Sequence, residues 1–150
     1  YQEIVAVASG LLAESKLTPE LKNEAYYYRA KALLAEGQSK EAVNDLSVLS
    51  KDTRNVYGAE AKYLLAQLYF DAGQTDKAEK EVLDYIEVST PHAYWLARSF
   101  VLLSDVYMKL GRNLDAKQYL LSLQRNYQAD DDIAGMIETR LAKLNKGSKQ

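Results

Sequence analysis

The sequence contains no cysteine, a single histidine (His92) and only two prolines in 150 residues. The lack of cysteine excludes disulfides, thiolate metal sites and a cysteine nucleophile. A chain of this length can still bury a hydrophobic core without such cross-links. One histidine cannot supply the histidine pairs of common metal sites, and no base–nucleophile motif accompanies it. We therefore expect no catalysis, no metal and no cofactor, and we predict that His92 is a solvated residue in the first turn of a helix.

Concentrated charge and long apolar runs are also lacking. The 19 basic and 21 acidic residues give a net charge of −2, and no basic cluster stands out. Nucleic-acid binding depends on such a positive cluster. The longest apolar stretches, such as residues 100–103, are far shorter than the roughly 20 residues of a membrane-spanning helix. Neither a nucleic-acid partner nor direct membrane insertion is expected.

What the sequence does contain is an internal repeat centred on glycine. Gly37, Gly73 and Gly111 follow one another at intervals of 36 and 38 residues. Glycine can end a helix in the left-handed backbone conformation, and small residues let two helices approach closely. Each glycine has a small residue seven positions before it and an alanine five positions after it, and these pairs are Ala30 and Ala42, Ala66 and Ala78, and Ser104 and Ala116. The repeat therefore predicts antiparallel helix pairs that turn at the glycines.

Helix-capping residues recur at a fixed distance from the same glycines. Two positions after each glycine stands Ser39, Thr75 or Asn113, which we predict to cap the second helix of each pair. The first helices have another start signal, a threonine followed by proline, at 18–19 and 90–91.

Apolar residues recur with helical spacing, and strand-like alternation is not sustained. The sequence thus predicts an all-α fold of about eight helices, at 2–14, 19–36, 39–51, 57–72, 75–88, 91–110, 113–127 and 131–145. Stepping back 36 residues from Ala42 reaches Ala6. We therefore interpret 2–14 as the second helix of a repeat whose first helix would precede Tyr1.

The expected organisation is one domain over 1–150, with three repeats at 19–51, 57–88 and 91–127 and a tail at 146–150. The helix at 131–145 is predicted to cap the C-terminal end. Its apolar stripe is Ile133, Ile137, Leu141 and Leu144. The aspartates at 130–132 stand where the helix dipole favours negative charge. As a metal site they are disfavoured, because consecutive helical residues diverge from one another.

These residues resemble the tetratricopeptide repeat. The second repeat matches its pattern best, with Leu65, Ala66, Tyr69, Gly73, Ala78, Val82 and Tyr85, and the third has Leu103, Ser104, Tyr107, Gly111, Ala116, Leu120 and Leu123. The first repeat departs from the pattern at Arg29 and Leu33, no repeat ends in the family's proline, and the period exceeds the usual 34 residues. The resemblance implies a right-handed α-solenoid, a superhelix of antiparallel helix pairs.

In this family the first helices line a concave groove that binds proteins. The resemblance places ten residues at groove-facing positions: Tyr27, Lys31, Leu34, Tyr63, Gln67, Phe70, Arg98, Val101, Asp105 and Met108. Such a mixed aromatic and apolar groove suits a peptide or helical segment. The carboxylate clamp of chaperone-binding members is not expected, because Arg98 alone fits it in type and place.

Two interpretations of these residues stay open. They are free for a protein or peptide ligand, or they are covered by preceding repeats or by self-association. The function is correspondingly a non-catalytic interaction scaffold, with a structural spacer at the end of a longer solenoid as the alternative. The long repeats are similar to those of bacterial envelope members of the family, so the periplasm or cell envelope is one expected compartment and the cytoplasm the other.

Overall fold

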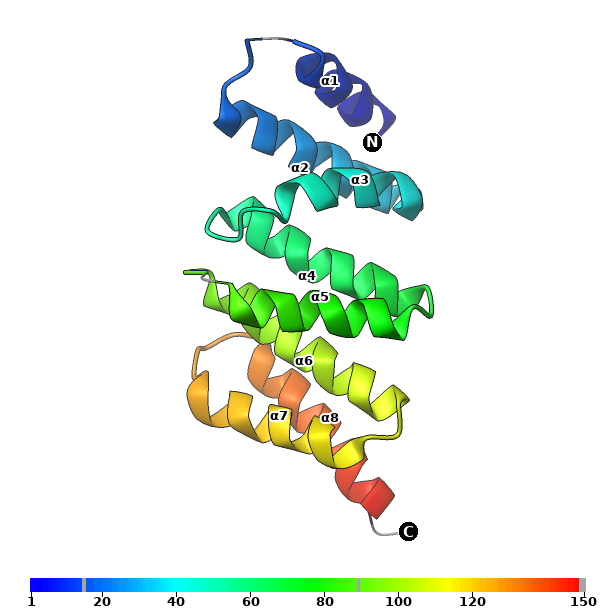
Figure 1. Ribbon diagram of the computed structural model, residues 1–150, viewed down its shortest axis with the longest axis vertical. Helices are drawn as coiled ribbons and strands as arrows, with labels where there is room; N and C mark the ends of the chain where they lie inside the picture. The colour runs from blue at the N-terminus through cyan, green and yellow to red at the C-terminus, as the bar shows by residue number, and fades with distance from the viewer. Residues whose placement is uncertain (15, 89, 149–150) are drawn as a thin grey trace.

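The computed structural model describes residues 1–14, 16–88 and 90–148, and within these ranges it has eight α-helices and no strand. The helices are α1 (Gln2–Leu12), α2 (Pro19–Ala35), α3 (Ser39–Leu49), α4 (Val56–Asp71), α5 (Thr75–Glu87), α6 (Ala93–Lys109), α7 (Asn113–Asn126) and α8 (Ile133–Ser148). They stack along the long axis of the molecule from α1 to α8 (Figure 1). The all-α solenoid predicted from the sequence is confirmed.

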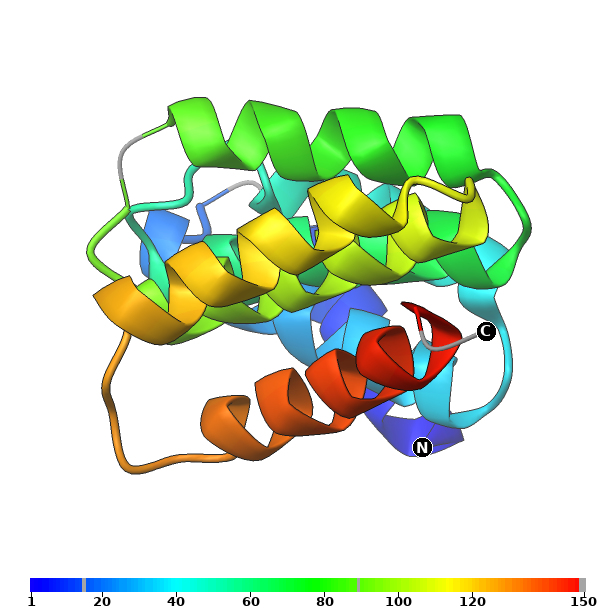
Figure 2. The same ribbon diagram turned by 90° about the horizontal axis from the view of Figure 1, so that it is seen from below.

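The stack is built from three helix pairs. The first helices α2, α4 and α6 pack on the second helices α3, α5 and α7 that follow them, and each second helix contacts the next helix along the chain. A view along the stack shows α5 and α8 on opposite sides of α6 (Figure 2). The first helices therefore form a surface of their own, away from the second helices.

Each pair is closed by a turn with a glycine at positive φ. The φ values of Gly37, Gly73 and Gly111 are 77°, 78° and 76°. In the middle turn, the Gly73 N–H donates to the Phe70 carbonyl at 3.0 Å, and the next N–H donates to the Tyr69 carbonyl at 2.8 Å. The other two turns have the same pair of bonds, which define a Schellman motif. This backbone is strained for any residue with a Cβ, which explains glycine here.

The predicted caps of the second helices are wrong by one position. Ser39, Thr75 and Asn113 are the first residues of their helices, and the residue before each holds the cap position without a side-chain cap bond. The reason lies in the glycine turn. The N–H of the residue after each glycine donates to a carbonyl of the preceding helix. The next helix therefore begins at the residue that follows.

The two threonine–proline signals have different outcomes. Thr18 caps α2 as predicted, since its Oγ1 accepts the Leu21 N–H at 3.3 Å and Pro19 is the first helical residue. The signal at 90–91 does not start α6, because α6 begins at Ala93.

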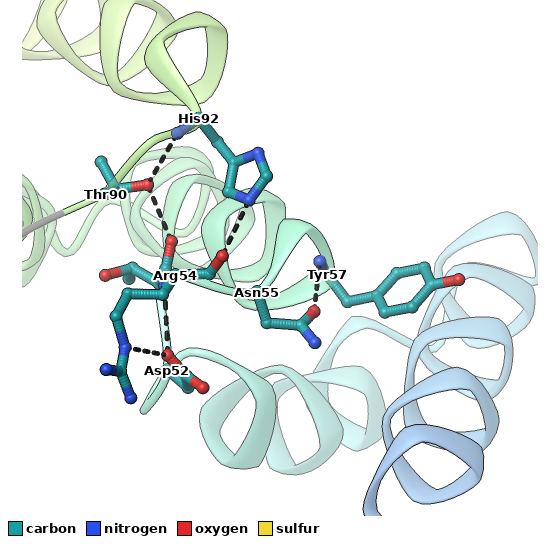
Figure 3. Close-up of polar contacts among 7 residues, drawn as sticks. Asp52, Arg54, Asn55, Tyr57, Thr90 and His92 are labelled. Atoms are coloured by element: carbon teal, nitrogen blue, oxygen red, sulfur yellow. Dashed lines mark hydrogen bonds and ion pairs between the residues drawn. The ribbon is translucent and has the colours of Figure 1, made fainter.

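Thr90 and His92 instead join two loops (Figure 3). Thr90 Oγ1 donates to the Thr53 carbonyl at 2.7 Å and accepts the His92 N–H at 3.1 Å. The His92 ring Nε2 lies 2.9 Å from the Arg54 carbonyl oxygen. His92 is thus a half-buried residue at the cap position of α6, which corrects the prediction of a solvated residue within the helix.

Small residues lie where the helices of each pair meet. Ala42, Ala78 and Ala116 have no exposed surface, and their partners Ala30, Ala66 and Ser104 are at most 1% exposed. Larger side chains fill the space between these contacts, as Tyr85 and Leu120 do with no exposed surface. The small residues therefore allow close approach, as the sequence predicts.

Ala6 differs from these alanines in its burial. Ala6 is exposed, and Ala8 is the residue of α1 that is buried. Within the described ranges α1 contacts α2 alone. None of the described helices packs against the other side of α1.

The last helix covers the opposite end of the stack. Ile133, Ile137 and Leu144 of α8 are 1%, 2% and 8% exposed and join the hydrophobic core of α6 and α7, with Leu141 half-buried beside them. Asp131 accepts the Ile133 N–H at 2.9 Å, so it supports the start of the helix. The apolar stripe read from the sequence is thus the packing face of α8.

Two glycine substitutions separate backbone strain from packing. An added Cβ at Gly73, or at Gly135 within α8, meets nothing within 4 Å. Gly73→Ala should lower the free energy of unfolding by about 1–2 kcal/mol, because its φ is positive. Gly135→Ala should raise it by about 0.5–1 kcal/mol, because alanine favours helix. Urea unfolding followed by circular dichroism measures both, and changes of the same sign would contradict this account.

Candidate functional site

The candidate site is the surface formed by the first helices, which we call the first-helix face. The ten predicted groove residues lie on α2, α4 and α6. Lys31 is exposed, and seven others are half-buried: Tyr27, Leu34, Gln67, Phe70, Arg98, Asp105 and Met108.

Tyr63 and Val101 do not fit the expectation of exposed groove residues. They are 5% and 3% exposed and belong to the hydrophobic core. The reason is that α4 and α6 lie in more extensive contact than α2 and α4, while α8 packs against α6. These two side chains hold helices together and offer little surface to a ligand.

Between α2 and α4, two predicted groove residues bind a carboxylate. The Tyr27 hydroxyl donates to Glu60 Oε1 at 3.0 Å, and Lys31 Nζ lies 2.7 Å from Glu60 Oε2. Glu60 is 7% exposed, so these bonds compensate for burying its charge. Burial and, next, the hydrogen bond to Glu60 raise the pKa of Tyr27 from 10.0 to about 12. This cluster joins two repeats.

Between α4 and α6, an arginine is surrounded by aromatic groups. Arg98 donates to the Tyr63 hydroxyl at 3.2 Å and to the Tyr94 hydroxyl at 3.3 Å. Its guanidinium carbon lies 4.9 Å from the Tyr63 ring centroid and 5.9 Å from that of Trp95, within cation–π range. No carboxylate in the described part of the chain lies within 4.0 Å of its nitrogens. Arg98 is thus a half-buried cation with hydroxyl and ring partners only.

Between α6 and α8, the predicted groove residue Asp105 forms a bidentate ion pair with Arg140. Arg140 donates to its two oxygens at 2.8 and 2.9 Å. Tyr94 also donates to the carboxylate of Asp132, the residue just before α8, at 2.8 Å. The start of α8 and its middle therefore occupy part of the first-helix face beside α6.

An apolar row runs along the same face. Leu34, Phe70 and Met108 lie on three successive first helices, each three residues before a turn glycine, and each keeps partial exposure. The Lys109 ammonium lies 5.8 Å from the centroid of the Phe70 ring. Because its members stand at repeat-equivalent positions, the row offers one apolar contact on each first helix.

Four residues that matter here were missed by sequence reasoning: Glu60, Tyr94, Trp95 and Arg140. A signal existed for three of them. Glu60 lies three residues before Tyr63, and Tyr94 and Trp95 lie four and three before Arg98, so each shares a helical face with a predicted site residue. Arg140 had no such signal, because it comes from α8.

Comparison with known proteins agrees with the geometry. The helix pairs define the class as an α-solenoid, and a family model described as tetratricopeptide repeat matches residues 59–90 and 97–127. These two ranges of the chain are tetratricopeptide repeats. The family is a non-catalytic repeat fold that mediates protein–protein interactions. Searches of curated proteins and of solved structures return no match to the chain.

Two further observations bear on the chemistry of the molecule. Among the residues placed by the structure, no group of three His, Asp or Glu side chains could hold a metal ion. The helices in the described ranges all fall short of the length and hydropathy of a membrane span. What the first-helix face offers is apolar contact, hydrogen bonding and one arginine outside any ion pair.

High pH should weaken the fold through Tyr27. Its hydroxyl must keep its proton to donate to Glu60, and its pKa is about 12 when folded against 10.0 ordinarily. The unfolded chain therefore ionises first, so this stabilisation is complete below pH 10 and is lost as the pH rises toward 12. Thermal melting across this range should show a steeper loss of Tm for wild type than for Tyr27→Phe. Tyr28→Phe, at an exposed neighbour, is the control and should follow wild type.

Proposed function

We propose that this chain is a non-catalytic scaffold that holds a peptide or helical segment of another protein along the first-helix face. The observation that carries the proposal is the row of Leu34, Phe70 and Met108, one from each first helix and all partly exposed. Peptide-binding grooves recognise side chains at regular intervals along a ligand. A row repeated from helix to helix fits such spaced apolar anchors.

Arg98 adds a polar element to the proposed groove. Its guanidinium has five N–H donors, of which two bind the hydroxyls of Tyr63 and Tyr94. It is half-buried and, in the ranges covered by the structure, outside any ion pair. An acidic side chain of the ligand would complete its partners with a charge-assisted bond.

A second candidate is a structural spacer that positions other domains. It is favoured by the pairs Lys31–Glu60 and Asp105–Arg140, in which groove-facing residues bind neighbouring helices. Side chains used in this way stiffen the rod and are less available to a ligand.

Peptide display separates the two candidates. Peptides selected from a random library against the immobilised chain should lose affinity by about tenfold or more for Leu34→Lys and for Met108→Lys, because each change puts a charge into the apolar row. The matched control is Leu114→Lys, a change to an exposed leucine of α7, which should leave affinity unchanged. Circular dichroism checks that all three variants are folded.

The scaffold proposal fails if no peptide is selected, or if the selected peptides bind both row variants as tightly as wild type. Either outcome favours the spacer.

A further inference from the structure

The junction between the first two helix pairs carries a cleft that the proposed groove does not use. It has a volume of about 520 Å³ and lies between the start of α3 and the end of α4, on the side of the stack where the glycine turns follow one another (Figure 1). Its lining includes Lys40 and Val43 of α3, Leu68 and Tyr69 of α4, and Gln74 of the turn after α4. The cleft lies between two helix pairs that are both present in full.

The next junction along the chain shows what can fill the equivalent space. Tyr69 corresponds to Tyr107, and Gln74 to Arg112, each at the same distance from its turn glycine. The guanidinium carbon of Arg112 lies 4.4 Å from the centroid of the Tyr107 ring, and one of its nitrogens lies 3.7 Å from a carboxylate oxygen of Glu79. Tyr107 is 4% exposed, whereas Tyr69 is half-buried. At the later junction the chain therefore covers its own tyrosine, and at the earlier one it does not.

The earlier junction also lacks the groups that hold such an arginine. Val43 and Lys77 stand at the positions that, one repeat later, hold the two carboxylates bound to Arg112. Lys77 Nζ lies 5.8 Å from the centroid of the Tyr69 ring, and Lys40 lines the cleft. Neither lysine forms an ion pair with any residue that the structure describes. The cleft thus combines apolar walls with two lysines that have no acidic partner there.

These features indicate the chemistry of what binds. Val43, Leu68 and Tyr69 are all half-buried, so an apolar side chain placed between them would remove further apolar surface from water. The one carboxylate in the lining, Asp71, already accepts a hydrogen bond from Gln67 at 2.8 Å. The lysines outnumber it, so the cleft favours a negative charge beside the apolar group. Tetratricopeptide repeats mediate protein–protein interactions, which favours a protein segment as the ligand.

We propose that this cleft docks a segment of a partner protein that inserts an aromatic side chain with a carboxylate beside it. The aromatic side chain covers the Tyr69 ring, as Arg112 covers Tyr107 one repeat later. The carboxylate pairs with Lys40 and Lys77. Since no residue of the cleft belongs to the apolar row on the first-helix face, this proposal and the proposed function can fail independently.

The probe is a synthetic peptide of about eight residues with one tryptophan between two aspartates, matched to a twin with lysines in their place. NMR titration of the isotope-labelled chain should show shifts of the amides of Val43 and Tyr69 with the aspartate peptide. That peptide should bind about tenfold or more tighter than its twin. Combining Lys40→Glu with Lys77→Glu should reverse the preference, whereas Lys117→Glu, at an exposed lysine of α7, should preserve it.

A further variant fills the cleft from within. Gln74 is exposed, and its backbone angles (φ −90°, ψ 65°) are close to those of Arg112 (φ −94°, ψ 63°). Gln74→Arg should therefore place a guanidinium over the Tyr69 ring and weaken binding of the aspartate peptide about tenfold or more. The matched control is Gln38→Arg, at the equivalent exposed position of the first turn, which adds the same charge and should not weaken binding. Circular dichroism should show that both variants are folded.

Three results would overturn the proposal. They are no binding of the aspartate peptide, equal binding of the two peptides, and binding by the Gln74→Arg variant that is as tight as that of wild type. Sedimentation adds a fourth, since a dimer of the wild-type chain that Gln74→Arg abolishes would assign the cleft to a second copy of the chain.

Discussion

The burial of small residues within each helix pair is the constraint on which the rest of this molecule depends. Ala42, Ala78 and Ala116 have no exposed surface, and the first helix of each pair also buries a small residue to at most 1% exposure. The glycine turn a few residues earlier sets the angle at which the chain returns. Since turn and contact recur together, each pair has the same geometry, and stacking the pairs gives a rod.

The rod has two kinds of surface as a result. Along the first-helix face, polar bridges such as Tyr27–Glu60 and Arg98–Tyr63 cross from one repeat to the next, while a partly exposed apolar row runs beside them. The first and last helices differ in how far their apolar side chains are buried. α8 buries Ile133 and Ile137 against α6 and α7, whereas Val7 of α1 is exposed.

The fold could be predicted because it depends on local spacing. Glycine and alanine at fixed offsets indicate turn and contact and predict the six helices of the three pairs, while the apolar stripe of residues 133–144 predicts α8. The site was less predictable, because burial on the first-helix face depends on how near the next first helix lies. Tyr27 and Tyr63 hold equivalent positions, yet Tyr63 is covered by α6, which contacts α4 more extensively than α4 contacts α2. The burial of Ala6 was unpredictable for a related reason: spacing predicts its position in the repeat but not which helices pack around it.

The most direct measurement compares enlargement of a contact alanine with the same change at Ala6. Ala78→Leu inserts a large side chain where the helices of a pair meet, so it should lower the free energy of unfolding by about 1–3 kcal/mol or more. Ala6→Leu, at the position 72 residues earlier that the repeat spacing makes equivalent, should change it by no more than about 0.5 kcal/mol, because Ala6 is exposed. Equal effects of the two substitutions in urea unfolding would contradict the account, since they would mean that close contact at the alanines does not hold the helix pairs together.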